Sequence, residues 1–400
     1  MTFRVPDHIR PLRDEVHRFM TERVEPAEEA LRAGGPEAAD LLADLQRAAK
    51  DQGLWALGHP AELGGGGLPF LDYVYVNEVQ GRSEFGQLAL GTWTLQDSIM
   101  LDKHASPHWR EAYLGPLVAG EISPSFAMTE PGVAGSDPTG LQTTARLDGD
   151  EWVINGHKWF TTGAAGAAYT TVMCRTETDA APHASFSMII VPTDTPGYRI
   201  VRETPLLGLP AGGHGGHYDV EFDDVRVPAA NLLGERGRGF LIAQERLGPG
   251  RIFHAMRWLG QAQRAFDLMC ARLNEREAFG EPLAEKQLMQ KHVFDSYTEI
   301  QASRLLTLAA AEQIDRGDQA RVEIGAVKVY GAQMLHHVID RAVQVYGAAG
   351  VTEDTPLSHM YRSARFARLY DGADEVHIQS VGKRILGEYK RGGSWEFGLR

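Results

Sequence analysis

Two neighbouring stretches decide how the sequence is interpreted: residues 126–137, FAMTEPGVAGSD, and residues 154–164, INGHKWFTTGA. In the first, proline and glycine stand among small polar residues, a composition that predicts a loop. Gly132, Gly135 and Ser136 would expose backbone N–H groups there. Such groups can donate hydrogen bonds to carbonyl or phosphate oxygens of a ligand, although the composition alone also fits an ordinary connecting loop.

The second stretch contains Asn155–Gly156, a dipeptide that favours a tight hairpin turn. Trp159 follows, and a tryptophan just after a turn usually packs in the core or at a sheet edge. Here Thr161–Gly163 comes directly behind it, so hydroxyl groups and a glycine lie next to the indole. An indole that can stack on a planar ring, beside a hydroxyl that can donate to a ring nitrogen, is typical of a site for an aromatic cofactor.

Around these stretches, residues 123–236 have the pattern of a β domain. Asp148–Asp150 is a second strong turn signal, and the short apolar runs at Trp152–Ile154 and Ser185–Val191 fit strands. Over Tyr218–Asp223, hydrophobic residues alternate with acidic ones, which predicts a half-buried strand.

The segment before this domain, residues 1–122, is helical in pattern. Apolar residues recur at spacings of three and four in a run that Gly53 should stop, and a further helix is expected over Leu71–Arg82. Between them, Glu62–Gly67 holds four consecutive glycines and predicts a loop.

The segment after it, residues 237–400, predicts a C-terminal four-helix bundle. One long helix carries an apolar seam made of Ile252, Ala255, Leu259, Ala262, Phe266, Met269 and Leu273. Three more helices are expected over Leu283–Arg316, Ala320–Gly347 and Asp374–Tyr389. The expected fold class is therefore α+β and mainly helical, with an N-terminal helical domain, a middle β domain and a C-terminal bundle.

Composition and charge restrict the classes of function. The 400 residues are 43% hydrophobic, enough for two or three domains, and the formal net charge is −13. An acidic chain without a basic cluster is not expected to bind nucleic acid or an anionic membrane surface. The two cysteines form no CxxC pair, and neither His214 with His217 nor His336 with His337 has further ligands at metal-site spacing, so no metal is expected.

No feature of the sequence predicts secretion or membrane insertion. Met1–Arg10 lacks an apolar run followed by a cleavage site, and the longest apolar stretch, near Met188–Val191, is far shorter than the roughly 20 residues of a transmembrane helix. A cytoplasmic location is expected. Neither a Walker loop nor a GxGxxG fingerprint occurs, which argues against a nicotinamide cofactor.

Together, FAMTEPGVAGSD and INGHKWFTTGA resemble the acyl-CoA dehydrogenase family, and the resemblance covers nearly the whole chain. It is strongest over Phe126–Ala164, His214–Leu283 and Gln344–Leu386, and the family has the same order of helical, β and helical domains. One departure is visible, because TEPGVAGSD is one residue longer than the common TEPGAGSD form. The resemblance implies FAD as the cofactor, held by the β domain against the bundle.

The resemblance also implies which residues contact FAD. Within the chain's own site these would be Phe126, Met128, Thr129, Ser136, Trp159, Phe160, Thr161, Ala373 and Glu375. A neighbouring subunit would add Arg276, Phe279, Gln287, Gln344 and Gly347, the last in a glycine-rich turn where only small residues allow close approach. A monomer would then have an incomplete FAD site, so a homodimer or homotetramer is expected.

For the substrate, the resemblance implies an acyl-CoA in contact with Ser136, Arg251, Tyr370 and Gly372. Arg251 ends the segment LGPGR at residues 247–251, where a surface arginine would be unremarkable without the resemblance. A fixed guanidinium beside the ligand would suit an anionic or polar group.

The segment 370–377, YDGADEVH, carries the implied catalytic base, Asp371. The common family form has a glutamate there, which removes the substrate α-proton, and some members place the base at the position of Gly250, which has no side chain. An aspartate reaches about 1.5 Å less far than a glutamate, against the tight geometry of proton transfer. Asp374 is predicted to be the N-cap of the last helix.

The reaction implied is α,β-dehydrogenation of an acyl-CoA thioester to the 2,3-enoyl-CoA, with hydride transfer to the flavin. An electron-transferring flavoprotein would then reoxidise the cofactor. Two alternatives stay open. One is a flavin-dependent oxidase of the same fold, either an acyl-CoA oxidase or a relative of nitroalkane oxidase, whose branch also carries an aspartate at this position. The other is a catalytically silent, flavin-binding assembly protein.

Overall fold

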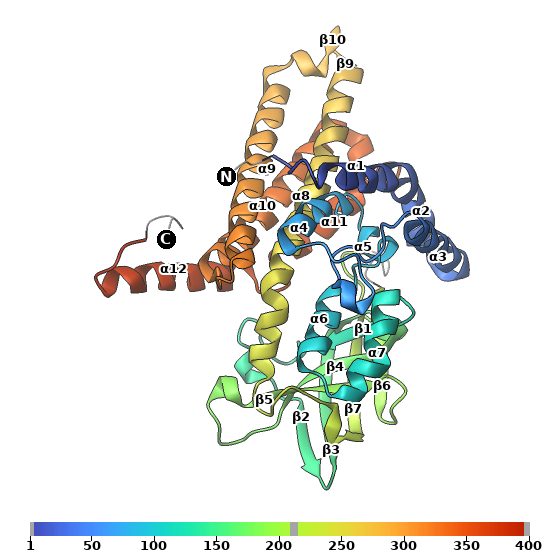
Figure 1. Cartoon of the computed structure of the whole chain (residues 1–400). Coiled ribbons are helices and arrows are strands. Elements are labelled where there is room, and N and C mark those ends of the chain that lie inside the picture. The colour runs from blue at the N-terminus through green and yellow to red at the C-terminus, as the bar shows by residue number, and fades with distance from the viewer. Residues whose placement is uncertain (1–3, 209–214, 396–400) are drawn as a thin grey trace. The chain divides into compact units, whose positions relative to one another are not determined.

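The computed structural model describes residues 4–208 and 215–395 (Figure 1). His214, considered above as a metal ligand, lies outside the described residues. The chain divides into two compact units. The bundle unit consists of Met1–Glu25, Pro69–Gly86 and Gly248–Arg400, and the sheet unit consists of Pro26–Leu68 and Gln87–Leu247.

An eight-stranded mixed sheet is the framework of the sheet unit within the described residues. Its strands are β1 (Ser123–Ala127), β2 (Thr144–Asp148), β3 (Glu151–Thr162), β4 (Ala167–Arg175), β5 (Phe186–Pro192), β6 (Tyr198–Glu203), β7 (His217–Pro228) and β8 (Leu232–Leu233). They lie in the order β6-β7-β3-β1-β4-β5-β8, and β2 pairs with β3 and β4. β4 is parallel to β1 and β2, whereas the other pairs are antiparallel.

Both faces of the sheet are buried at β5, which explains why this strand is almost wholly apolar. Successive side chains of a strand point to opposite faces. Along β5, Met188 and Ile190 therefore lie in one hydrophobic cluster, and Ile189 and Val191 lie in another. The first cluster also takes side chains from α6 (Leu95–His104), α7 (Pro107–Ala119) and the first turns of α8 (Gly239–Glu275).

The hairpin turn predicted at Asn155–Gly156 is wrong, because β3 continues through both residues. The amide of Asn155 instead forms two hydrogen bonds of 2.9 Å with Asp224 on β7, where the register of the two strands shifts. A Cβ atom on Gly156 would lie 2.4 Å from Oγ1 of Thr143, so a close approach of the backbone requires this glycine. The turn predicted at Asp148–Asp150 is confirmed, since β2 ends at Asp148 and β3 begins at Glu151.

Helices and turns make up most of the rest of the sheet unit. Besides α6 and α7 they include α2 (Glu25–Ala33), which begins at the boundary residue, α3 (Gly35–Asp51) and the 3₁₀ turn η2 (Ala61–Leu63). The helix predicted to stop at Gly53 is α3, and Gly53 follows it in the left-handed conformation with φ 68°.

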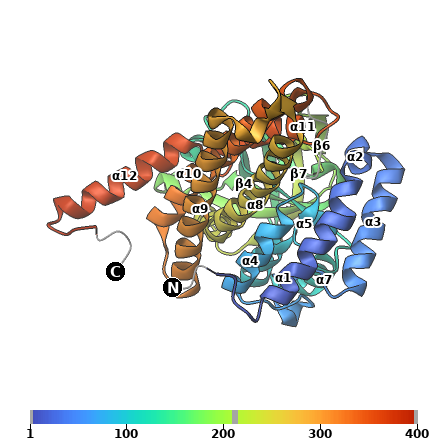
Figure 2. The same ribbon diagram turned by 90° about the horizontal axis from the view of Figure 1, so that it is seen from above.

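Three long helices and several shorter ones form most of the bundle unit within the described residues. They are the part of α8 after Leu247, then α9 (Gln287–Asp315), α10 (Arg321–Tyr346), α11 (Leu357–Ala364) and α12 (Asp374–Lys390), joined by α1 (Arg10–Phe19) and α4 (Phe70–Gln80). α8, α9 and α10 run alongside one another (Figure 2). Buried or half-buried ion pairs tie the helices together: Arg304 of α9 binds Glu78 of α4, and Arg341 of α10 binds Glu299 of α9.

The predicted fold class is confirmed by this order of a helical N-terminal region, a middle β domain and a helical C-terminal region. The C-terminal helices begin and end within a few residues of their predicted bounds. Among the described helices, none is both long enough and apolar enough to cross a bilayer.

Candidate active site

The loop before α12 holds Asp371 in a fixed backbone conformation. Asp371 has a φ of 54°, in the left-handed region that non-glycine residues rarely adopt. Its carbonyl oxygen accepts a hydrogen bond from Nε of Arg251 at 3.0 Å and another from Nε2 of His377 at 3.0 Å. A carbonyl can only accept, so Nε2 of His377 carries the hydrogen, and burial lowers the pKa of His377, which favours this neutral form.

Gly372 completes the loop because no larger residue would fit. Its φ is 97°, and a Cβ atom there would lie 2.6 Å from Nε2 of His377. The hydrogen bond from His377 to the Asp371 carbonyl therefore depends on a glycine at position 372. Within the described residues, the backbone N–H of Gly372 makes no hydrogen bond.

The Asp371 carboxylate contacts a histidine that the sequence analysis missed. Nε2 of His254 lies 3.1 Å from Oδ2 of Asp371, and the two side chains are 22% and 25% exposed. His254 lies on α8 one turn after Gly250, where some family members were expected to carry the base. The sequence pattern could have identified His254, because Arg251, His254 and Trp258 are spaced three and four residues apart and so share one face of a helix.

Tyr370, expected at the substrate, is anchored through its hydroxyl. Oη of Tyr370 accepts a hydrogen bond of 2.8 Å from Nε1 of Trp258, and burial of this group raises the pKa of the phenol. The residue is still 38% exposed, so part of its surface stays available to a ligand.

The predicted N-cap role of Asp374 is wrong. The N-cap residue of α12 is Ala373, and Asp374 is the first helical residue, 2% exposed. Its carboxylate accepts hydrogen bonds from Nε of Arg368 at 2.7 Å, Nε2 of Gln333 at 3.3 Å and Nζ of Lys328 at 3.5 Å. Asp374 is therefore the centre of a buried charged cluster directly after the Asp371 loop, while the predicted cofactor residue Glu375 is exposed.

In the sheet unit, hydrogen bonds hold the two quoted stretches together. The backbone N–H of Trp159 donates to the carbonyl of Thr129 at 3.0 Å, and Nζ of Lys158 donates to the carbonyl of Met128 at 2.8 Å. Lys158, which the sequence analysis did not single out, also binds Oε1 of Glu130 at 2.9 Å. The predicted flavin residues of the loop and of β3 are thus fixed relative to one another.

Several polar atoms of these stretches are available to a ligand. The hydroxyl of Thr161 and Nε1 of Trp159 are buried and have no hydrogen-bond partner among the residues that the structure describes. The backbone N–H groups of Gly132, Gly135 and Ser136 also make no hydrogen bond in that part of the chain. Buried polar groups are nearly always satisfied, so the Thr161 and Trp159 groups fit a cofactor that offers ring nitrogens and carbonyl oxygens. Gly132, Gly135 and Ser136 are exposed, so their N–H groups are open to a ligand or to water.

Two aromatic residues flank this set. Phe160, at a bulge of β3, has a φ of 54° and is 37% exposed. The ring of Phe126 lies under the guanidinium of Arg246 at 4.6 Å, and Arg246 is held by Asp97 at 2.9 Å. Ser136, expected to contact both ligands, is exposed.

The residues expected to serve a neighbouring subunit lie at one end of the bundle unit. Arg276, Phe279, Gln287, Gln344 and Gly347 are all exposed, and Phe279 is 98% exposed. Arg272 lies over the ring of Tyr346 at 5.4 Å, which brings the end of α8 beside the end of α10. The structure therefore gathers these residues on one surface without burying them.

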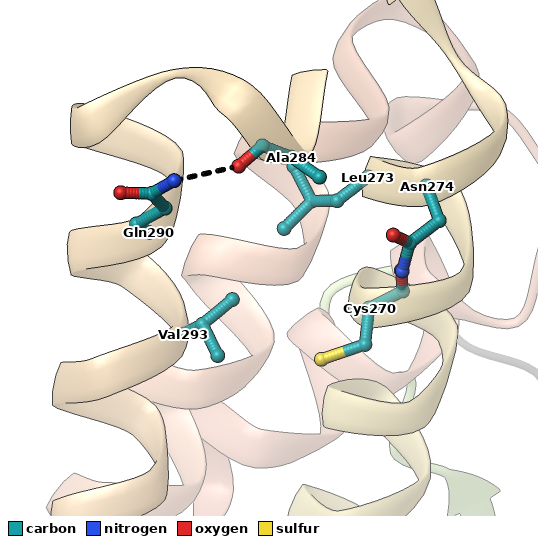
Figure 3. A pocket seen from close by; sticks show the side chains of 6 residues that line it. All are labelled: Cys270, Leu273, Asn274, Ala284, Gln290 and Val293. Carbon is teal, nitrogen blue, oxygen red and sulfur yellow. Dashed lines mark hydrogen bonds between the residues drawn. The ribbon is translucent and has the colours of Figure 1, made fainter. Parts of the chain in front are cut away.

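A shallow hollow opens near the same end of α8 and the start of α9 (Figure 3). Its lining consists of Cys270, Leu273, Asn274, Ala284, Gln290 and Val293. Nε2 of Gln290 donates to the carbonyl of Ala284 at 3.0 Å, and burial raises the pKa of the Cys270 thiol. The hollow therefore offers neither a reactive thiolate nor a group of the expected site.

Comparison with known proteins identifies the family of the chain. The sequence matches the N-terminal domain of acyl-CoA dehydrogenases at residues 6–121, the middle domain at 125–225 and the C-terminal domain at 237–386. Among solved structures, the acyl-CoA dehydrogenase of Geobacillus kaustophilus superposes with a TM-score of 0.84 at 26% identity, over 95% of this chain and 98% of the other. Butyryl-CoA dehydrogenase of Megasphaera elsdenii gives 0.84 at 27%, over 96% and 100%.

Curated relatives give the same result. A Mycobacterium tuberculosis protein named "Probable acyl-CoA dehydrogenase FadE2" is 44% identical over 93% of this chain and 94% of its own length. Acyl-CoA dehydrogenase family member 11 of Rattus norvegicus is 38% identical over 94% of this chain, which spans only 50% of that protein. The chain belongs to the acyl-CoA dehydrogenase family.

Proposed function

We propose that the chain catalyses α,β-dehydrogenation of an acyl-CoA thioester to the 2,3-enoyl-CoA, with Asp371 as the base that removes the α-proton. One observation carries this proposal: Asp371 is held at both its carbonyl and its carboxylate, by Arg251, His377 and His254, yet its side chain stays 25% exposed. A base must be both fixed and accessible to the proton that it takes.

Acyl-CoA dehydrogenases are FAD-dependent flavoproteins, so FAD is the cofactor of this chain. The bound flavin supplies the acceptor for the hydride that leaves the substrate β-carbon. Trp159 and Thr161 would hold the ring system through an indole face and a hydroxyl, and the N–H groups of Gly132 and Gly135 would bind oxygens of the cofactor. The other residues of the chain proposed at this site are Phe126, Met128, Thr129, Ser136, Phe160, Ala373 and Glu375.

The chain's own groups would perform the proton transfer. Asp371 would take the α-proton, while the backbone N–H of Gly372 would donate to the thioester carbonyl and make that proton more acidic. Arg251 uses Nε to fix the Asp371 backbone, so we assign it a positioning role beside the substrate. The shorter aspartate would then act from a loop whose left-handed turn sets its reach.

Relatives of known substrate indicate the class of thioester. One solved structure of the fold is a glutaryl-CoA dehydrogenase in complex with glutaryl-CoA, with a TM-score of 0.85 and 25% identity, and another is the butyryl-CoA dehydrogenase described above. These relatives support an acyl-CoA with a saturated α,β-bond as the substrate here.

We propose an electron-transferring flavoprotein as the acceptor of the electrons. A solved structure described as the electron transferring flavoprotein of Acidaminococcus fermentans superposes on this chain with a TM-score of 0.84 at 27% identity.

We also propose that the exposed group of Arg276, Phe279, Gln287, Gln344 and Gly347 contacts the FAD of a second copy, which makes the active protein a homodimer or homotetramer.

The test is anaerobic mixing of the flavin-loaded protein with a series of acyl-CoAs of different length and branching. Bleaching of the flavin by at least one of them, with formation of the matching 2,3-enoyl-CoA, is the expected result. Bleaching by nitroalkanes but by no acyl-CoA would replace this proposal with the nitroalkane oxidase alternative, and acyl-CoA turnover that consumes oxygen without another acceptor would identify an acyl-CoA oxidase.

A further inference from the structure

We infer that His254 is a positioning residue for Asp371 and that Arg257 fixes which ring nitrogen of His254 carries the hydrogen. The three residues form a chain of hydrogen bonds, from Arg257 to His254 to Asp371. This inference rests on the proposed function of Asp371 as the base, and it adds residues for which the family motifs gave no role.

The direction of the chain follows from Arg257. Its Nη2 lies 2.8 Å from Nδ1 of His254, and a guanidinium can only donate. Nδ1 of His254 must therefore accept, so the neutral ring carries its hydrogen on Nε2. That hydrogen faces Oδ2 of Asp371 across 3.1 Å, which makes His254 a donor to the carboxylate.

The charges around the ring keep His254 neutral. A second hydrogen on Nδ1 would point at Nη2 of Arg257 and place two cations in contact. Arg251 and Lys328 add positive charge near Asp371, and His377 donates to its carbonyl. Among the described residues, the acidic side chains near this group are Asp371 itself and Asp374, and the Asp374 carboxylate is engaged by Lys328 and Arg368. Tyr370 stays protonated because burial raises its pKa.

The ring of His254 is also held in place by its aromatic neighbours. It stacks on Trp258 at 6.0 Å with an interplanar angle of 26°, and it lies 5.1 Å from the ring of Tyr370. Arg257 itself comes from a tightly packed part of α8, because a Cβ atom on Gly81 would lie 2.2 Å from its Cα atom. The donor at Nε2 is therefore aimed at Asp371 by packing as well as by hydrogen bonding.

Two consequences follow for the reaction. First, the bond restricts the rotation of an aspartate that has little reach to spare, so the carboxylate is aligned before substrate binds. Second, both ring nitrogens of His254 are engaged, so His254 cannot take the proton that Asp371 removes from the substrate. The proton would stay on Asp371 until it is released to solvent.

The experiment compares His254→Phe, which keeps an aromatic ring but removes the donor, with His254→Gln, whose amide can still donate to Asp371. Flavin-loaded proteins are mixed anaerobically with a saturating acyl-CoA that bleaches the wild-type flavin, across a range of pH. We expect His254→Phe to reduce flavin about tenfold more slowly, with its acid limb at higher pH, and His254→Gln to recover most of both properties.

Controls separate this inference from the proposed function. His337→Phe, on the exposed face of α10, should leave rate and pH profile unchanged, and flavin content and melting temperature are measured for every variant. Wild-type rate and pH profile in His254→Phe, with Asp371→Asn still slow, would overturn the inference alone. Wild-type flavin reduction in Asp371→Asn would instead contradict the proposed function.

A second variant covers the case in which His254→Phe does not fold. His254→Asn, whose shorter amide cannot reach Asp371, then gives the same comparison.

Discussion

Nζ of Lys158 lies 2.9 Å from Oε1 of Glu130, and the two side chains are 0% and 5% exposed. Burial alone would raise the pKa of Glu130, but Lys158 and the N–H groups of Gln142 and Thr143 outweigh it and hold this pKa below its ordinary value. The pair joins β3 to the loop after β1 and so holds both parts of the expected flavin surface.

Replacing Lys158 should therefore cost stability. Lys158→Met leaves Glu130 buried without its cation, and we expect a loss of about 3–5 kcal/mol in the free energy of unfolding. Urea unfolding measures it, and the double variant with Glu130→Gln should regain part of the loss. Lys291→Met, which breaks an exposed pair with Asp295, is the control and should cost at most about 1 kcal/mol. An equal loss of unfolding free energy in both variants would show that the buried Lys158–Glu130 pair stabilises the fold no more than an exposed pair does.

Removing the Thr161 hydroxyl should weaken FAD binding without lowering the stability of the protein. It has no partner within the described residues, so Thr161→Val should leave the stability of the FAD-free protein unchanged or slightly higher. FAD affinity should fall about tenfold, the usual effect of losing one hydrogen bond to a ligand.

Thr162→Val is the contrasting change, because the hydroxyl of Thr162 already bonds to Nδ1 of His217 at 2.9 Å. It should cost about 1 kcal/mol of stability and leave FAD affinity nearly unchanged. FAD titration of the FAD-free proteins measures both affinities. Unaltered FAD binding by Thr161→Val would argue that this hydroxyl does not contact the cofactor.

The order of domains could be predicted from the sequence because it depends on local patterns. The apolar seam of α8 and the glycine and proline breaks between α9, α10 and α12 are properties of neighbouring residues. Asn155–Gly156 misled the same reasoning: the dipeptide favours a turn locally, but Asp224 and Thr143 on neighbouring segments make it a bulge. Local preference was overridden by partners outside the strand that carries the dipeptide.

The site was predictable only where a motif identified it. Asp371 was found through the resemblance of YDGADEVH, whereas its contact with His254 joins residues more than a hundred positions apart. Asp374 shows the same limit. At the start of a helix it has the residue type of an N-cap, and only the arrival of Lys328 and Gln333 from α10 shows that its carboxylate is buried.

Asp374→Asn should consequently be harmful, whereas an N-cap role for Asp374 would predict a neutral change, since asparagine is also a good N-cap. It leaves Lys328 and Arg368 without their buried counter-charge, and we expect a loss of about 3 kcal/mol at neutral pH. The neighbouring Glu375→Gln, on an exposed residue, should change stability by less than about 0.5 kcal/mol.

The loss should also depend on pH. Burial lowers the pKa of Lys328, and Asp374 opposes this shift. Without Asp374 the folded-state pKa falls further below the unfolded value, so the folded variant binds fewer protons than the unfolded chain and its stability rises with pH. The difference from wild type should shrink between pH 7 and pH 9.5 in urea unfolding, and a difference that is constant or grows would contradict the role of Lys328.

The exposed residues at the end of the bundle unit predict that assembly and flavin retention are linked. Arg276→Ala with Gln344→Ala should keep the fold, since both residues are exposed, but should lose FAD and favour the monomer. Sedimentation at several protein concentrations, recorded at a flavin wavelength, follows both properties. Arg316→Ala, in an exposed helical pair with Glu312, is the control. A flavin-loaded monomer would contradict the sharing of residues between subunits.

Asp371 allows the most direct test of the proposed chemistry. Asp371→Asn keeps the size and the hydrogen-bonding capacity of the side chain but removes its basicity. It should retain FAD and bind acyl-CoA, while flavin reduction slows by about 10²-fold or more. Rapid anaerobic mixing measures the rate, and near wild-type reduction would exclude Asp371 as the base.

Asp371→Glu then asks how the loop sets the reach of the carboxylate. Arg251 and His377 hold the carbonyl of residue 371 through its left-handed turn, and His254 holds the carboxylate at 3.1 Å. If this frame is built for aspartate, a longer side chain cannot keep the bond from His254 without crowding the substrate, and reduction should slow by about tenfold. If glutamate instead raises the rate of flavin reduction, the loop has the same geometry as in relatives with a glutamate base. Arg251, His377 and His254 would then not compensate for the shorter reach of the aspartate.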